Sequence, residues 1–288
     1  MIVSASYRTD IPAFFGSWFG ARLAQGWVQV KNPYGGPLRT VSLAPADVDA
    51  FVFWTRNAGS FFPTLADLAA RGTPFVVQFT LTGYPRALET ATVAAEIALA
   101  QIRRLAETYG ARSVVWRYDP VLSTSLTPPH WHAANFAQLA GTLAGTVDEV
   151  VLSFAQIYAK TRRNLSAAAA EHAFAWDDPE PEAKAELLAR LAAIAADHGL
   201  RASLCGQSDL TAANLPEARC IDLDRLSDVA GRPIAAPAKP HRKCACAASV
   251  DIGGYDTCPH GCTYCYAVRN RAAAKRNFAA HLEIDAAL

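Results

Sequence analysis

The sequence predicts an α/β protein built as a parallel β/α barrel of the TIM type. Short apolar runs alternate with longer Ala- and Leu-rich segments at spacings of roughly thirty to forty residues, the pattern of repeated strand-helix units. Runs such as 50–54 and 75–80 are almost continuously apolar, as expected of parallel strands buried on both faces. The 288 residues, 51% hydrophobic and 18% charged, are sufficient for one large core.

The expected elements follow in chain order. Strands are expected at 2–6, 50–54, 75–80, 113–116, 149–154, 201–205 and 249–252, with a further short strand near Cys220, which gives about eight strands for a closed or nearly closed barrel. Helices are expected at about 12–25, 65–70, 92–109, 132–144, 181–198 and 266–282. Pro12 suits the start of the first helix, because proline fits the first helical turn.

The domain organisation is expected to be simple. Residues 1–230 form the barrel, and residues 231–288 form a Cys-rich segment that completes the same domain. Pro233, Pro237 and Pro240 make 231–240 a connector between the two parts.

Three cysteines near the C-terminus carry the most specific chemical pattern. Cys258, Cys262 and Cys265 have the spacing C-x3-C-x2-C, on a loop between a predicted strand and a predicted helix. Three thiolates on one loop can bind three irons of a [4Fe-4S] cluster and leave the fourth iron open. Other interpretations are a zinc site, which usually has paired C-x2-C ligands, a disulfide framework, which the odd count of seven cysteines disfavours, or inert thiols.

This loop, with Tyr264 before its last cysteine, resembles the signature of radical S-adenosylmethionine (radical SAM) enzymes. The resemblance implies that the open iron chelates the methionine part of S-adenosylmethionine and that Tyr264 packs near the adenine. In that family the loop follows the first strand, so its position here implies either a circularly permuted, radical-SAM-like barrel or an independent arrangement of the barrel. The chain has no Gly-Gly-Glu run to hold the methionine amino group, and the permuted arrangement would assign that role to Arg8 or Asp10.

Polar residues at the predicted strand ends supply further candidates, because β/α barrels carry their reactive groups there. Arg117 and Asp119 lie two residues apart on extended chain and face the same side, where Arg117 could hold an anion and Asp119 orient a donor. Their alternative role is a mutual salt bridge, and any of these residues could instead be a solvated loop residue or helix cap. The catalytic candidates are Arg117, Asp119, Arg8 and Asp10, and the cofactor-binding candidates are Tyr264, Gln78 and Arg56.

The other four cysteines, Cys205, Cys220, Cys244 and Cys246, form a second predicted set. Four thiolates from converging segments would complete a second [4Fe-4S] cluster or a structural zinc site. Buried free thiols are the alternative interpretation.

Charge and hydropathy restrict the partners. The net charge of +1 gives no general case for nucleic acid or a membrane. Basic residues around the cysteines are expected to offset thiolate charge, with nucleic acid a less favoured partner; they are Lys239, His241, Arg242, Lys243, Arg269, Arg271, Lys275 and Arg276. No apolar run has transmembrane length and the start lacks a signal-peptide pattern, so a cytoplasmic, reducing location is expected.

Several segments together look like the bacterial DUF1848 family across the whole chain; they are 4–12, 53–57, 116–120 and 249–267. That family is uncharacterised, and its terminal cysteine cluster is described as similar to that of radical SAM proteins. The leading hypothesis is therefore a radical SAM-type enzyme of unknown substrate, reduced by a donor such as flavodoxin or ferredoxin. The alternatives are a non-catalytic iron–sulfur or zinc protein, in a redox or nucleic-acid-binding role, and, less favoured, a zinc hydrolase.

Overall fold

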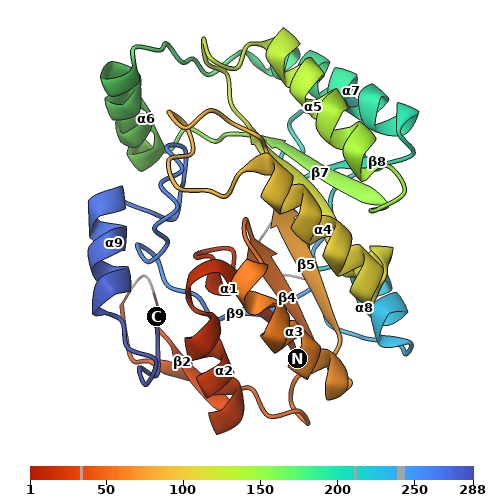
Figure 1. Ribbon diagram of the computed structural model, residues 1–288, viewed down its shortest axis with the longest axis vertical. Helices are drawn as coiled ribbons and strands as arrows, with labels where there is room; N and C mark the ends of the chain where they lie inside the picture. The colour runs from red at the N-terminus through yellow and green to blue at the C-terminus, as the bar shows by residue number, and fades with distance from the viewer. Residues whose placement is uncertain (33–34, 211–212, 239–243) are drawn as a thin grey trace.

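A parallel β-sheet forms the centre of the molecule. The computed structural model describes residues 1–32, 35–210, 213–238 and 244–288. Seven parallel strands have the order β8-β7-β6-β5-β4-β1-β9 (Figure 1). They are β1 (Ile2–Ala5), β4 (Ala50–Thr55), β5 (Phe75–Thr80), β6 (Val114–Val121), β7 (Glu149–Phe154), β8 (Arg201–Leu204) and β9 (Val250–Asp251). The predicted α/β class is confirmed, and within the described ranges no pairing joins β8 to β9.

Helices and a hairpin surround this sheet (Figure 1). The α-helices are α1 (Ile11–Phe14), α2 (Gly16–Gln25), α3 (Phe62–Ala70), α4 (Ala95–Tyr109), α5 (Pro129–Leu143), α6 (Ala159–His172), α7 (Pro181–Asp197), α8 (Leu223–Ala230) and α9 (Arg271–Ala280). Two short 3-10 helices, η1 (Gly59–Phe61) and η2 (Ala111–Ser113), precede α3 and β6. Strands β2 (Trp27–Val30) and β3 (Arg39–Ser42) form a separate antiparallel pair. No helix in the described ranges is long and apolar enough to cross a membrane.

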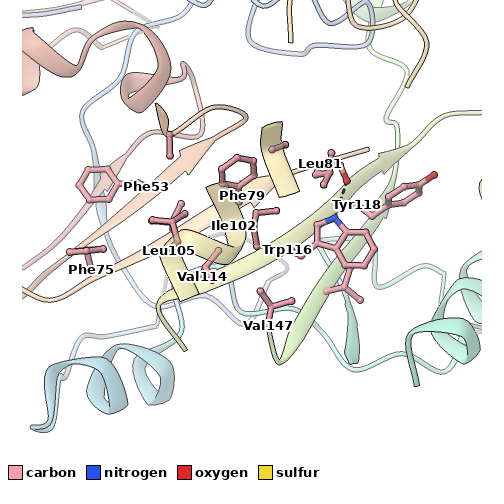
Figure 2. Packing of buried hydrophobic residues seen from close by; sticks show 14 of the residues in the cluster. Phe53, Phe75, Phe79, Leu81, Ile102, Leu105, Val114, Trp116, Tyr118 and Val147 are labelled. Carbon is pink, nitrogen blue, oxygen red and sulfur yellow. Dashed lines mark hydrogen bonds between the residues drawn. The ribbon is translucent and has the colours of Figure 1, made fainter. Parts of the chain in front are cut away.

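The larger core lies between the sheet and the helices that follow its strands. Figure 2 shows Phe79 and Trp116 from neighbouring strands packed with Ile102 and Leu105 of α4. The buried Trp116 indole donates its Nε1 hydrogen to the carbonyl of Leu81 over 2.9 Å, so its one polar group is satisfied. This packing fixes the strands whose ends carry the candidate site.

The opposite side chains of the same strands form a second face, which we call the inner face. Its apolar residues are Ile2, Ala50, Val52, Val76, Val115 and Val151. They pack with Leu226 of α8 and with buried residues of the segment that follows β8, including Cys220 and Cys246. Because side chains alternate along a strand, Gln78 and Arg117, each two residues beyond an inner-face valine, belong to this face as well.

Strand β9 lies beside β1, although nearly the whole chain separates them. Val250 and Asp251 are in register with Val3 and Ser4. The Asp251 carboxylate accepts hydrogen bonds of 2.7 Å from the hydroxyls of both Ser4 and Ser6. The strand that leads into the C-x3-C-x2-C loop is therefore fixed next to the first strand of the chain.

Several elements differ from the sequence-based expectations. The helix expected at 12–25 is divided at Phe15 into α1 and α2, and the final helix begins at Arg271, because the cysteine loop continues to that point. Helices α6 and α8 and the antiparallel strands β2 and β3 were not predicted. In the described residues the sheet has seven strands, and the segment near Cys220 makes only an isolated bridge, between Leu204 and Glu217.

Strand β6 continues through Arg117 and Asp119, which were expected to follow it. It continues because Val121 still pairs with Phe154 of β7 after a register shift. Both candidate side chains therefore have a strand backbone rather than a loop backbone.

Candidate functional site

The cysteine loop occupies the carboxyl side of β9, as its position between a strand and a helix predicted. Its backbone is attached to the segment after β5: the amide of Thr263 donates to the carbonyl of Leu88 over 3.0 Å, and Cys262 forms an antiparallel bridge with Glu89. Helix α6 supports the other side, where Asn164 donates to the carbonyl of Val268 over 3.3 Å. Tertiary contacts therefore hold the loop against the sheet from both sides.

The three loop thiols are partly buried neighbours, with charged groups such as Asp10 and Arg56 close to them. Burial raises the pKa of all three, and that of Cys262 rises to about 12. The thiols also raise one another's pKa, because adjacent thiolates repel. Backbone groups of Ala267 and Val268 hydrogen-bond to Cys265, and the backbone of His260 hydrogen-bonds to Cys258. Hydrogen bonds to sulfur of this kind accompany iron–sulfur ligands and tune their potentials.

Asp10 anchors this loop to the start of the chain. Its Oδ1 accepts hydrogen bonds from the Ala13 amide at 2.9 Å and the Thr55 hydroxyl at 2.8 Å. Its Oδ2 accepts from the Arg56 amide at 2.7 Å and from Nε2 of His260 at 2.8 Å. Asp10 therefore caps α1, fixes the end of β4 and holds the residue between the first two cysteines.

Arg56 links the loop to a pocket on its other side. The Arg56 guanidinium bonds to the Glu89 carboxylate at 2.8 Å and to the Tyr264 hydroxyl at 2.6 Å, and that hydroxyl also donates to Glu89. Burial lowers the pKa of Arg56, but Glu89, Tyr264 and Cys262 raise it further, so the guanidinium stays charged. Arg56, Glu89, Thr80 and Thr82 line a pocket of about 180 Å³ at the start of α4.

Arg8 lies on the other side of β1, close to β9. Its Nε forms an ion pair with Oδ1 of Asp251 at 3.7 Å, beyond hydrogen-bond distance, and this buried nitrogen has no hydrogen-bond partner among the described residues. The guanidinium lies over the rings of Tyr7 and Tyr255 at 5.5 and 5.3 Å. The Arg8 guanidinium is thus fixed in place near the cysteine loop, and its Nε hydrogen remains available for a hydrogen bond.

Arg117 and Asp119 form the mutual ion pair that was the alternative interpretation. Nε of Arg117 donates to Oδ2 of Asp119 over 3.0 Å, and Ser153 donates to the other carboxylate oxygen. Nη1 of Arg117 also donates to Gln78 at 3.1 Å and to Sγ of Cys220 at 3.0 Å. Gln78 is buried and bonded to Arg117 and to the Cys220 carbonyl. Arg117 and Gln78 therefore contact Cys220 of the second cysteine set, and Asp119 is linked to it through Arg117.

No group of three or more His, Cys, Asp or Glu side chains in the described part of the chain surrounds a single metal-ion position. A [4Fe-4S] cluster makes a different demand, because each cysteine binds its own iron and the three sulfurs surround a cluster that is larger than a single ion. The donor set at Cys258, Cys262 and Cys265 consists of soft thiols with backbone donors to sulfur, which is the chemistry that such a cluster requires. The residues present are therefore chemically compatible with an iron–sulfur cluster.

The sequence reasoning did not select Glu89, His260 and Asp251, although the structure places them around the loop. His260 lies inside the cysteine spacing and could have been noticed there, and Asp251 precedes a Gly-Gly pair. Glu89 has no such signal, because only the fold brings it to Arg56. Of the predicted basic residues, Lys239, His241, Arg242 and Lys243 lie outside the described ranges.

A family model matches most of the chain. The model of a domain of unknown function, DUF1848, matches residues 2–267. No curated protein matches the chain. The match contains the sheet, both cysteine sets and the residues around them, and the chain accordingly belongs to the DUF1848 family.

Proposed function

We propose that this protein is a radical SAM-type iron–sulfur enzyme whose open [4Fe-4S] cluster is bound by Cys258, Cys262 and Cys265. The observation that carries the proposal is the seating of the C-x3-C-x2-C loop at the carboxyl end of β9, directly beside β1. When bound, such a cluster supplies one electron to S-adenosylmethionine, which yields methionine and a 5′-deoxyadenosyl radical that abstracts hydrogen from substrate.

The sheet order supports a circularly permuted version of the barrel that the resemblance implies. Read from the edge, the order β9-β1-β4-β5-β6-β7-β8 begins with the strand before the cysteine loop. In a barrel of that family the strand equivalent to β9 comes first in the chain. Cutting the chain between that strand and β1, and joining the strand to the end of the chain after β8, gives the arrangement seen here. In parallel sheets of this class, ligands bind at the carboxyl ends of the strands.

The residues near the loop have distinct roles under this proposal. Arg8, whose buried Nε has no described hydrogen-bond partner, is suited to hold the carboxylate of the methionine part of S-adenosylmethionine. Asp10 already accepts four hydrogen bonds, so we assign it the positioning of the loop rather than a contact with the methionine amino group. Tyr264 lies on the loop itself and its hydroxyl accepts a hydrogen bond from Arg56. We assign its ring to the contact with adenine that the resemblance implies.

The test is anaerobic purification followed by assays of iron, sulfide and S-adenosylmethionine cleavage in the presence of a strong reductant. We expect an electron paramagnetic resonance spectrum that S-adenosylmethionine perturbs, and release of 5′-deoxyadenosine, both lost in the Cys258→Ala/Cys262→Ala/Cys265→Ala variant. Iron-containing protein that neither binds nor cleaves S-adenosylmethionine would favour the non-catalytic alternative. Zinc in place of iron would exclude the radical mechanism.

A further inference from the structure

Four cysteines that the proposed reaction does not use meet on the inner face of the sheet. Sγ of Cys205 lies 3.5 Å from Sγ of Cys220, and the Cys220 thiol hydrogen-bonds to Cys246. Cys244 is close enough to Cys246 to raise the pKa of its thiol. These thiols come from three separate segments of the chain. Cys205 follows β8, Cys220 lies in the next segment, and Cys244 and Cys246 lie in a third.

Backbone pairing fixes this convergence. The amide of Ala218 donates to the carbonyl of Leu204 over 2.8 Å, which places the chain before Cys220 along the end of β8. The amide of Ala247 donates to the carbonyl of Ile221 over 3.0 Å, which places Cys246 beside Cys220. The cysteines are therefore held by specific main-chain contacts, although they lie up to 41 residues apart.

The polar groups around the thiols are the kind that stabilise anionic sulfur. The buried Arg117 guanidinium donates to Sγ of Cys220 over 3.0 Å. Backbone groups of Cys220 and Ile221 hydrogen-bond to the sulfur of Cys246, and this lowers the pKa of that thiol together with the bond from Cys220. Neutral, inert thiols in a core require no buried cation and no convergent N–H donors.

We propose that Cys205, Cys220, Cys244 and Cys246 bind a second iron–sulfur cluster, with Arg117 as a hydrogen-bond donor to its sulfur ligands. The four thiols supply one ligand for each iron of a [4Fe-4S] cluster, and a structural zinc ion with four thiolate ligands is the alternative that metal content distinguishes. Cys244 and Cys246 lie two residues apart, so on extended chain both side chains project to one side.

Binding requires ordinary ligand chemistry. Each thiol loses its proton as its sulfur binds one iron of a preassembled cluster, so transfer of the cluster to the protein releases protons and changes no oxidation state. Cys205 must rotate away from Cys220, which its position at the end of β8, where the side chain is half-buried, allows. The Arg117 charge then faces a negative cluster rather than only Asp119.

The experiment compares iron, sulfide and zinc contents of four full-length proteins purified anaerobically. They are the wild type, Cys205→Ser/Cys246→Ser, Cys258→Ala/Cys262→Ala/Cys265→Ala, and the control Arg219→Gln, which alters an exposed residue next to Cys220. We expect about eight irons in the wild type and control and about four in each cysteine variant. The irons left in the triple variant test this site even if S-adenosylmethionine cleavage fails, so the two proposals can fail separately.

Three results would each overturn the proposal. They are a Cys258→Ala/Cys262→Ala/Cys265→Ala variant that contains no iron, one zinc ion bound in place of the second cluster, and a Cys205–Cys220 disulfide found by mass spectrometry. If Cys205→Ser/Cys246→Ser does not fold, Arg117→Gln is added to the triple variant. We expect it to shift the spectrum and reduction potential of the remaining cluster, because hydrogen bonds to sulfur set that potential. An unchanged spectrum and potential would also contradict the proposal.

Discussion

Nε2 of His260 donates a hydrogen bond to Oδ2 of Asp10 over 2.8 Å, across 250 positions of sequence. Both side chains are buried, with 4% and 7% exposure, so water does not compete for the bond. The contact joins the cysteine loop to the turn after β1. It makes Asp10 a determinant of loop geometry without placing it among the ligands.

Replacement of Asp10 by Asn tests this role. The Asn side chain keeps one acceptor oxygen but turns an NH2 group toward donors, so the free energy of unfolding should fall by about 3 kcal/mol. Urea unfolding measures this change. Asp67→Asn, at an exposed pair with Arg71, is the matched control and should change stability by less than about 1 kcal/mol. Equal effects in the two variants would contradict the assigned role.

Gly253 should not tolerate a side chain. A Cβ at this position would lie 2.0 Å from the Ser6 hydroxyl and 2.5 Å from its Cβ, which would break the bond from Ser6 to Asp251. We expect Gly253→Ala to destabilise the protein by about 2 kcal/mol or more and to reduce iron binding. Gly20→Ala, where nothing lies within 4 Å of the added methyl in α2, should be neutral or stabilising by about 0.5–1 kcal/mol. Thermal unfolding of both variants decides the prediction.

His132 should make the protein sensitive to moderate acid. Burial lowers the pKa of His132 to about 4 from 6.5, so the unfolded state binds a proton that the folded state does not bind between these values. The folded state should therefore lose about 2 kcal/mol of stability between pH 7 and pH 5 through this group. Unfolding by urea at both pH values measures the loss.

His132→Gln is the companion variant, because it removes the titrating group that Tyr118 and the Leu122 carbonyl hold. The variant should be less stable at pH 7 but should show a smaller decrease between pH 7 and pH 5. A decrease as large as that of the wild type would assign the acid sensitivity to other groups.

Tyr264 should contribute its ring rather than its hydroxyl to S-adenosylmethionine binding, under the proposed function. Tyr264→Phe keeps the ring, so we expect the dissociation constant measured by calorimetry on reconstituted protein to change by less than about threefold. Tyr264→Ala should weaken binding about tenfold, which corresponds to about 1.4 kcal/mol. Tyr158→Ala, at an exposed aromatic position, serves as the control. Equal binding by all three variants would remove Tyr264 from the cofactor site.

The sequence predicted the strands well where apolar runs are continuous. β4, β5 and β7 lie where the runs of Val and Phe indicated, because strands buried on both faces leave a clear pattern. Helix α6 was missed, since its basic and Ala-rich sequence has little apolar periodicity, and α8 has only eight residues. The cysteine spacing identified the loop, but its partner Glu89 could not be predicted, because only tertiary packing brings it to Cys262 and Arg56.

The pairing of β9 with β1 has a consequence for how the protein is made. Until residue 250 has left the ribosome, the β1 edge has no described strand beside it, and the turn after β1 lacks His260. Contacts of such large sequence separation form late, because a long loop must close first. Under the proposed function, cofactor loading at the cysteine loop is therefore expected to follow the docking of β9 on β1, and an unloaded, open-edged intermediate is the form most exposed to aggregation.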